Sequence, residues 1–77
     1  MKPLSDLSIG ERARVISVSG RDTLLHRLQD FGLISGTEIT PLHLAPFGDP
    51  IAYLIRGAVI ALRHEDAKKI LVSPIKQ

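Results

Sequence analysis

The sequence predicts a small, mainly β protein: a barrel of about five short strands, with one packed amphipathic helix and one short C-terminal helical turn. Two observations carry this prediction. The apolar residues come mostly in short runs separated by glycine, proline and serine, a pattern typical of all-β domains. The chain has only 77 residues, and in so small a chain five strands can hide their edges only by curling into a barrel.

The strands follow from alternating or compact apolar runs that turn residues interrupt. A partial alternation of apolar and polar residues predicts the first strand over about residues 12–18. Compact apolar runs predict four more, over residues 38–45, 51–55, 58–62 and 71–73. Pro41 falls inside the second of these five strands and indicates either a sheet edge or a bulge, because proline cannot donate to the ladder.

Residues 21–31 change to the period of a helix. Leu24, Leu28 and Phe31 lie at positions i, i+4 and i+7, which places them on one apolar stripe of an amphipathic helix. A second, shorter helix is predicted over residues 64–70. Acidic residues occupy its first turn and lysines lie near its last, as the helix dipole favours.

Two connections are specific enough to predict their shape. Arg56-Gly57 joins two predicted strands, which indicates a tight hairpin. Residues 45–50, Ala-Pro-Phe-Gly-Asp-Pro, contain two prolines and a glycine, which predicts a stiff loop because each proline fixes its own φ. Phe47 in this loop is either presented to a partner or tucked under the barrel, and the sequence leaves both readings open.

The composition excludes several classes of protein. The chain has no cysteine, which excludes disulfides, iron–sulfur clusters, thiolate zinc sites and a cysteine nucleophile. Its longest strictly apolar run, residues 58–62, is far shorter than the roughly 20 residues of a membrane span. The first residues lack the apolar core of a signal peptide. We therefore expect one soluble, cytoplasmic domain over residues 1–77.

The histidines do not make a convincing metal site. His26 and Asp30 are four residues apart on the predicted helix, but two ligands do not complete a site, and a solvated helix face explains them as well. His43 has no partner that the sequence reveals, and His64 begins a helical turn rich in acids. No catalytic motif is present. We predict a protein that is not an enzyme and has no cofactor, and we identify no ligand set for a metal ion.

Charge and aromatic content argue against a nucleic-acid partner. Ten basic and eight acidic residues give a net charge of +2, and the basic residues are scattered rather than gathered in a stripe. The chain has only three aromatic residues, Phe31, Phe47 and Tyr53, too few for a base-stacking platform.

Three ordered segments of the chain resemble the FeoA family. They are residues 27–36 (Arg-Leu-Gln-Asp-Phe-Gly-Leu-Ile-Ser-Gly), residues 45–50, and residues 60–63 with Ala67 and residues 70–72. They are similar to the family's helix-to-turn signature, its Ala-Pro-Leu-Gly-Asp-Pro segment and its C-terminal pattern. Together the match covers about Leu4 to Val72. Phe47 stands where the family usually has leucine, which keeps an apolar side chain.

This resemblance implies an SH3-like barrel and a role in ferrous iron uptake. FeoA proteins are small cytoplasmic proteins linked to FeoB, the membrane protein with a GTP-binding domain that imports ferrous iron in bacteria. The first hypothesis is therefore a non-enzymatic accessory protein that docks on the cytoplasmic part of a FeoB-type transporter, without inserting into the membrane. The alternative is a small barrel with a nucleic-acid-binding or iron-responsive regulatory role.

The candidate docking residues lie in predicted turns, where a rigid surface binds with little ordering cost. They are Leu33 and Gly36 after the helix, Pro46, Phe47, Gly48, Asp49 and Pro50 in the stiff loop, and Arg56 at the hairpin tip.

Overall fold

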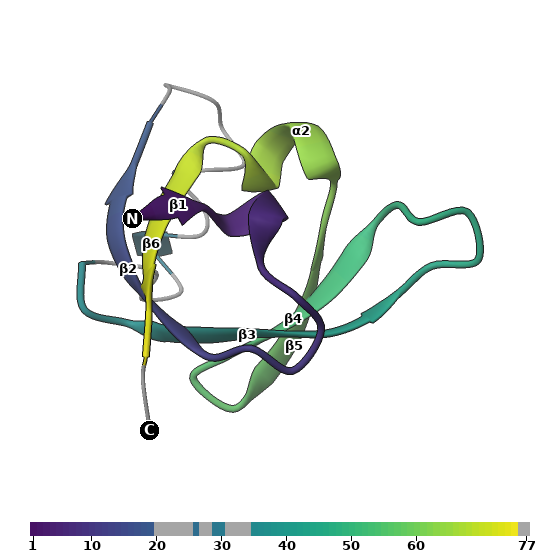
Figure 1. Cartoon of the computed structure of the whole chain (residues 1–77), viewed down its shortest axis with the longest axis horizontal. Coiled ribbons are helices and arrows are strands. Elements are labelled where there is room, and N and C mark those ends of the chain that lie inside the picture. The colour runs from purple at the N-terminus through teal and green to yellow at the C-terminus, as the bar shows by residue number, and fades with distance from the viewer. Residues whose placement is uncertain (20–25, 27–28, 31–34, 76–77) are drawn as a thin grey trace.

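A computed structural model describes residues 1–19, 26, 29–30 and 35–75. Within these residues the strands form one six-stranded antiparallel sheet in the order β1-β6-β2-β3-β4-β5 (Figure 1). The strands are β1 (Lys2–Pro3), β2 (Ala13–Val18), β3 (Glu38–Leu44), β4 (Ile51–Ile55), β5 (Ala58–Leu62) and β6 (Ile70–Pro74). Two helical turns accompany them, the 3-10 turn η1 (Leu4–Asp6) and the helix α2 (His64–Ala67). None of the helices described is long and apolar enough to cross a membrane.

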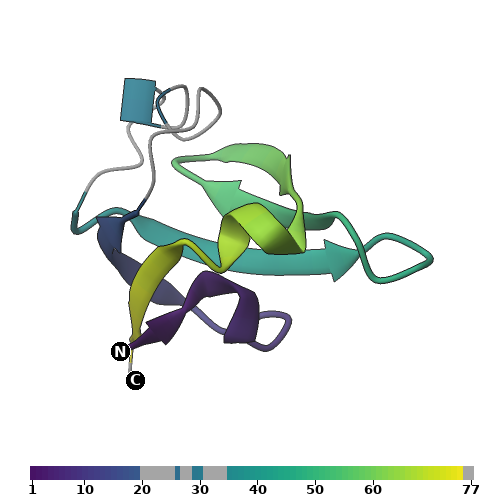
Figure 2. The same ribbon diagram turned by 90° about the horizontal axis from the view of Figure 1, so that it is seen from above.

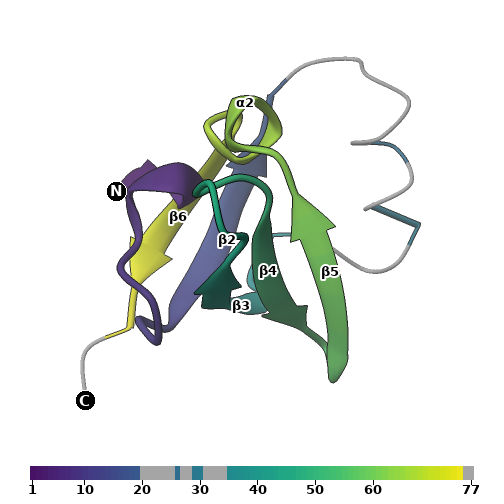
Figure 3. The same cartoon turned by 90° about the vertical axis from the view of Figure 1, so that its right-hand side faces the viewer.

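The sheet curves around a single apolar core. Alternate residues of the strands point inward, and Val15, Ile39, Tyr53 and Val72 are fully buried. The two helical turns lie side by side at one end of the curved sheet (Figures 1 and 3). The architecture is mainly β, as the sequence predicts.

The five strands β2 to β6 agree with the predicted ranges to within one residue at each end. Both β1 and η1 were absent from the prediction, because two extended residues and a single turn are too short to show a period. Strand β1 forms because Lys2 pairs with Val72 and Pro3 with Leu71. The structure therefore has six strands rather than five.

The second predicted helix is shorter than expected. It was predicted over residues 64–70, but α2 ends at Ala67 and Ile70 begins β6. Ile70 is fully buried and pairs with Val18 of β2, so pairing across the sheet sets the end of the helix. The helix predicted over residues 21–31 lies largely outside the described residues. Of that range only His26 and residues 29–30 are described, and they are helical and exposed.

Pro41 occupies a bulge, one of the two alternatives that the sequence left open. The pairing of β3 with β4 shifts register between Pro41 and His43, so Leu42 is the extra residue of the bulge. The Pro41 carbonyl accepts a hydrogen bond from the amide of Gly10 at 2.8 Å. This contact ties the turn before β2 to the middle of β3.

Candidate functional site

The loop over residues 45–50 projects from the end of the sheet between β3 and β4 (Figures 1 and 2). Two backbone hydrogen bonds close it. The amide of Gly48 donates to the carbonyl of Ala45 at 2.8 Å, and the amide of Ala45 donates to the carbonyl of Pro50 at 3.0 Å. Pro46 has its φ fixed by its ring, and Gly48 has a φ of +87°, which only glycine adopts without strain. We call residues 45–50 the β3–β4 loop.

Asp49 fastens the base of the β3–β4 loop to α2. Its Oδ1 atom accepts a hydrogen bond from the backbone amide of His64 at 2.8 Å. His64 is the first residue of α2, and Arg63 before it provides no side-chain cap. Free amides at a helix start need such an acceptor. A residue fifteen positions earlier in the chain therefore caps α2 and holds the loop in place.

Phe47 lies at the tip of this loop and is completely exposed, at 100% of its reference area. Of the two readings that the sequence left open, the structure shows the exposed one. Leu44 at the foot of the loop is half exposed. Burying a phenylalanine side chain is worth about 2 kcal/mol or more, and the fold of this chain does not gain it. An exposed phenyl ring on a braced loop has the form of an interface anchor.

Tyr53 lies on β4 and is fully buried, in contrast to Phe47. Within the described part of the chain its hydroxyl group has no hydrogen-bond partner. Burial raises the pKa of Tyr53 to about 12, and the negative charge of Asp49 acts in the same direction. The hydroxyl group therefore stays protonated at neutral pH.

The other candidate residues are not part of the β3–β4 loop. Ile39 pairs with Ile55, so the turn at Gly36 and the hairpin at Arg56 lie at the opposite end of the β3–β4 ladder from the loop. The Gly36 amide donates to the carbonyl of Val15 at 2.7 Å. Leu33 lies outside the described residues. The structure thus separates the predicted docking residues into two groups.

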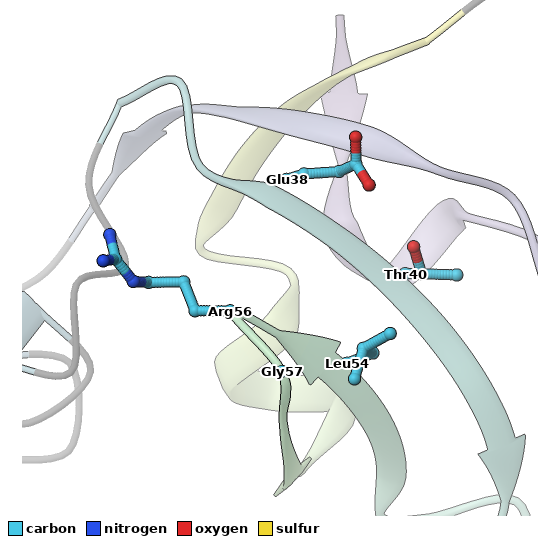
Figure 4. A pocket seen from close by; sticks show the side chains of 5 residues that line it. All are labelled: Glu38, Thr40, Leu54, Arg56 and Gly57. Carbon is cyan, nitrogen blue, oxygen red and sulfur yellow. The ribbon is translucent and has the colours of Figure 1, made fainter.

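A shallow hollow of about 210 Å³ lies beside Arg56. The residues that line it are Glu38, Thr40, Leu54, Arg56 and Gly57 (Figure 4). The guanidinium of Arg56 extends away from the Glu38 carboxylate, so the two charges do not converge on one point. A catalytic or small-molecule site needs convergent polar groups, and this hollow does not supply them.

Metal ligands do not converge in the described part of the chain. In residues 1–19, 26, 29–30 and 35–75, no three side chains of histidine, cysteine, aspartate or glutamate gather closely enough to hold an ion.

Two features were not found from the sequence. The capping contact of Asp49 joins residues too far apart for any local motif. The exposure of β5 was missed because Ala-Val-Ile-Ala-Leu is apolar at every position, and such a run is usually buried on both faces.

Comparison with known proteins places this chain in a family. Residues 2–74 match the FeoA domain. The Fe(2+) transport protein A/Fe(2+) transporter FeoB fusion protein of Porphyromonas gingivalis is 39% identical over 72 residues, which are 94% of this chain and 8% of that protein. The chain therefore spans only a small part of that relative.

Solved structures agree in fold. The FeoA protein from Chlorobium tepidum superposes with a TM-score of 0.90 at 36% identity, over 96% of this chain and 70% of that one. FeoA from Stenotrophomonas maltophilia, described as a procaryotic SH3 domain protein, has a TM-score of 0.82 at 28% identity, over 95% and 91% of the two chains. The chain belongs to the FeoA family and has the SH3-like fold of that family's solved structures.

Proposed function

We propose that this chain supports bacterial ferrous iron uptake by docking its β3–β4 loop on the cytoplasmic part of a FeoB-type transporter. The observation that carries the proposal is the complete exposure of Phe47. Its loop is closed by backbone hydrogen bonds and is fastened to α2 by Asp49. Because the loop is already ordered, binding through it loses little conformational entropy.

The fusion protein of Porphyromonas gingivalis supports the choice of partner. In that relative, a segment similar to this chain shares one polypeptide with a FeoB transporter. Fusion keeps two modules at a high effective concentration. Such an arrangement is useful when the two modules contact each other, and a compact anchor such as Phe47 is then sufficient for docking.

The regulatory nucleic-acid alternative has less support. Arg12 pairs with Glu38 at 3.9 Å, and Arg14 donates from Nη1 to the Gly36 carbonyl at 3.2 Å. Two of the arginines that could gather on a basic face therefore already have partners within the protein.

The test is an NMR titration of the isotope-labelled protein with the soluble cytoplasmic GTP-binding domain of the cognate FeoB, with and without nucleotide. We expect shifts centred on residues 45–50. The Phe47→Ser variant should bind at least tenfold more weakly, as expected for a central anchor, and should keep the wild-type unfolding curve. A matched control is Ile9→Ser, which removes a half-exposed apolar side chain from another part of the surface. Equal binding by the Phe47→Ser variant and the wild type would contradict the proposal.

A further inference from the structure

The two edges of the sheet differ in how they are protected. The edge strand β1 has only two residues, of which one is Pro3. Short length and proline both prevent another strand from pairing. The opposite edge strand, β5, has five residues and contains no proline, glycine or charged side chain. Short length, proline and charged side chains, three usual protections against strand addition, are therefore all missing from β5.

The register of the β4–β5 hairpin shows which backbone groups of β5 are open. Arg56-Gly57 forms a two-residue turn, so Ile55 and Ala58 are the first bonded pair. Bonded and non-bonded pairs alternate in an antiparallel ladder. The amide and carbonyl groups of Val59 and Ala61 therefore point away from β4. In the described part of the chain, β4 is the only strand that pairs with β5.

The side chains beside this open edge are apolar. Val59 is 61% exposed, and Leu54 opposite it on β4 is 39% exposed. Ala61 is also exposed. Figure 3 shows β5 at the border of the sheet. Backbone groups that can form hydrogen bonds thus lie next to a strip of exposed apolar side chains.

An arginine lies at each end of the edge strand β5. Arg56 immediately precedes the hairpin glycine, and Arg63 directly follows β5. Both side chains are exposed. Among the described residues neither guanidinium has an ion-pair partner, whereas Lys2 and Arg12 do. A segment laid along β5 would meet one free guanidinium at each end.

We propose that β5 is a strand-addition site for an extended partner segment that has an apolar centre of about five residues and a carboxylate side chain at each end. Main-chain hydrogen bonds to Val59 and Ala61 would supply affinity, as in other cases of β-augmentation. The two arginines would select the acidic ends by charge complementarity.

A second copy of this chain fits the site poorly. Two β5 strands paired antiparallel about Ile60 would bring Arg56 of each copy beside Arg63 of the other. Like charges placed opposite each other destabilise a strand pair. The same charges that favour an acidic partner therefore disfavour a homodimer through this edge.

The probe is a blocked synthetic peptide in which a valine–threonine repeat lies between terminal glutamates. A matched peptide carries lysines in place of the glutamates. On titration, the amides of Val59 and Ala61 should shift and become protected from hydrogen exchange, and the glutamate peptide should bind more tightly. The double variant Arg56→Glu with Arg63→Glu reverses both charges and should prefer the lysine peptide. Each arginine should change the peptide affinity about threefold to fivefold.

Ala61→Pro removes a backbone N–H group that points away from β4. The variant should therefore bind the peptide at least tenfold more weakly and keep the β4–β5 hairpin. Ala61→Thr keeps the amide and is the matched control. The Phe47→Ser variant should bind the peptide like wild type, which separates this site from the β3–β4 loop. The proposal would be overturned if millimolar peptide left the amide chemical shifts of Val59 and Ala61 unchanged. Full binding by a folded Ala61→Pro variant, or a dimer formed through β5 in sedimentation, would overturn it as well.

Discussion

At the scale of single residues, the two described aromatic side chains have opposite environments. Phe47 is fully exposed, and Tyr53 is fully buried with a hydroxyl group that has no hydrogen-bond partner among the described residues. A buried hydroxyl without a partner loses its hydration and gains no hydrogen bond in return. The ring of Tyr53 contributes to the core, while its oxygen opposes folding.

Tyr53→Phe should therefore leave the free energy of unfolding at neutral pH unchanged or raise it by up to about 1 kcal/mol. At high pH the two proteins should differ more. The pKa of Tyr53 is about 12 in the folded protein, against an ordinary value of 10.0, so the unfolded chain loses its proton first. Ionisation of Tyr53 therefore leaves the free energy of unfolding unaffected below pH 10 and lowers it as the pH rises to 12.

Urea unfolding at several pH values tests this. Between pH 10 and pH 12, the free energy of unfolding of the wild type should fall by about 2 kcal/mol more than that of Tyr53→Phe. Parallel curves for the two proteins across this range would contradict the assignment of a raised pKa to Tyr53.

At the scale of elements, the β3–β4 loop and α2 form one unit through the contact of Asp49 with the His64 amide. Helix α2 has only four residues, too few to be stable by itself. Each element therefore depends on the other. The exposed position of Phe47 also depends on this contact, since Asp49 holds the foot of the loop.

Asp49→Ala should lower the free energy of unfolding by about 1 kcal/mol, the usual effect of removing a helix cap. Hydrogen exchange of the His64 amide should become faster. Asp49→Asn keeps a side-chain oxygen that can accept the same bond, so it should retain most of the stability and the slow exchange. An Asp49→Ala variant with wild-type exchange at His64 would show that the contact does not hold the loop.

At the scale of the whole molecule, the N-terminal segment completes the core. Leu4 of η1 is fully buried, and η1 contacts both β6 and α2. Residues from the two ends of the chain thus meet in one cluster. A chain of 77 residues has a small core, so each fully buried side chain carries a large share of the stability.

Leu4→Ala should cost about 3 kcal/mol of unfolding free energy, within the range for large-to-small substitutions at buried leucines. That is a large fraction of the 5–15 kcal/mol typical of a domain. Thermal unfolding followed by far-ultraviolet circular dichroism measures the change. Leu44→Ala is the matched control. Because Leu44 is half exposed, this substitution should lower the free energy of unfolding much less. Similar losses for the two variants would contradict the position of Leu4 in the core.

The sequence by itself determined the local elements and the family. Strands β2 to β5, the Arg56-Gly57 hairpin and the closed turn of the β3–β4 loop all follow from patterns within a few residues, because side-chain alternation and turn chemistry are local. The FeoA resemblance rested on three short motifs in a given order, and the match over residues 2–74 confirms it.

The tertiary structure decided everything that depends on pairing between distant segments. It added β1 and η1, ended α2 at Ala67 because Ile70 pairs in β6, and left Phe47 exposed. It also separated Arg56 from the β3–β4 loop and placed β5 at one edge of the described sheet. No local pattern contains this information, because a strand's neighbours and a side chain's burial depend on which remote residues the fold brings beside it.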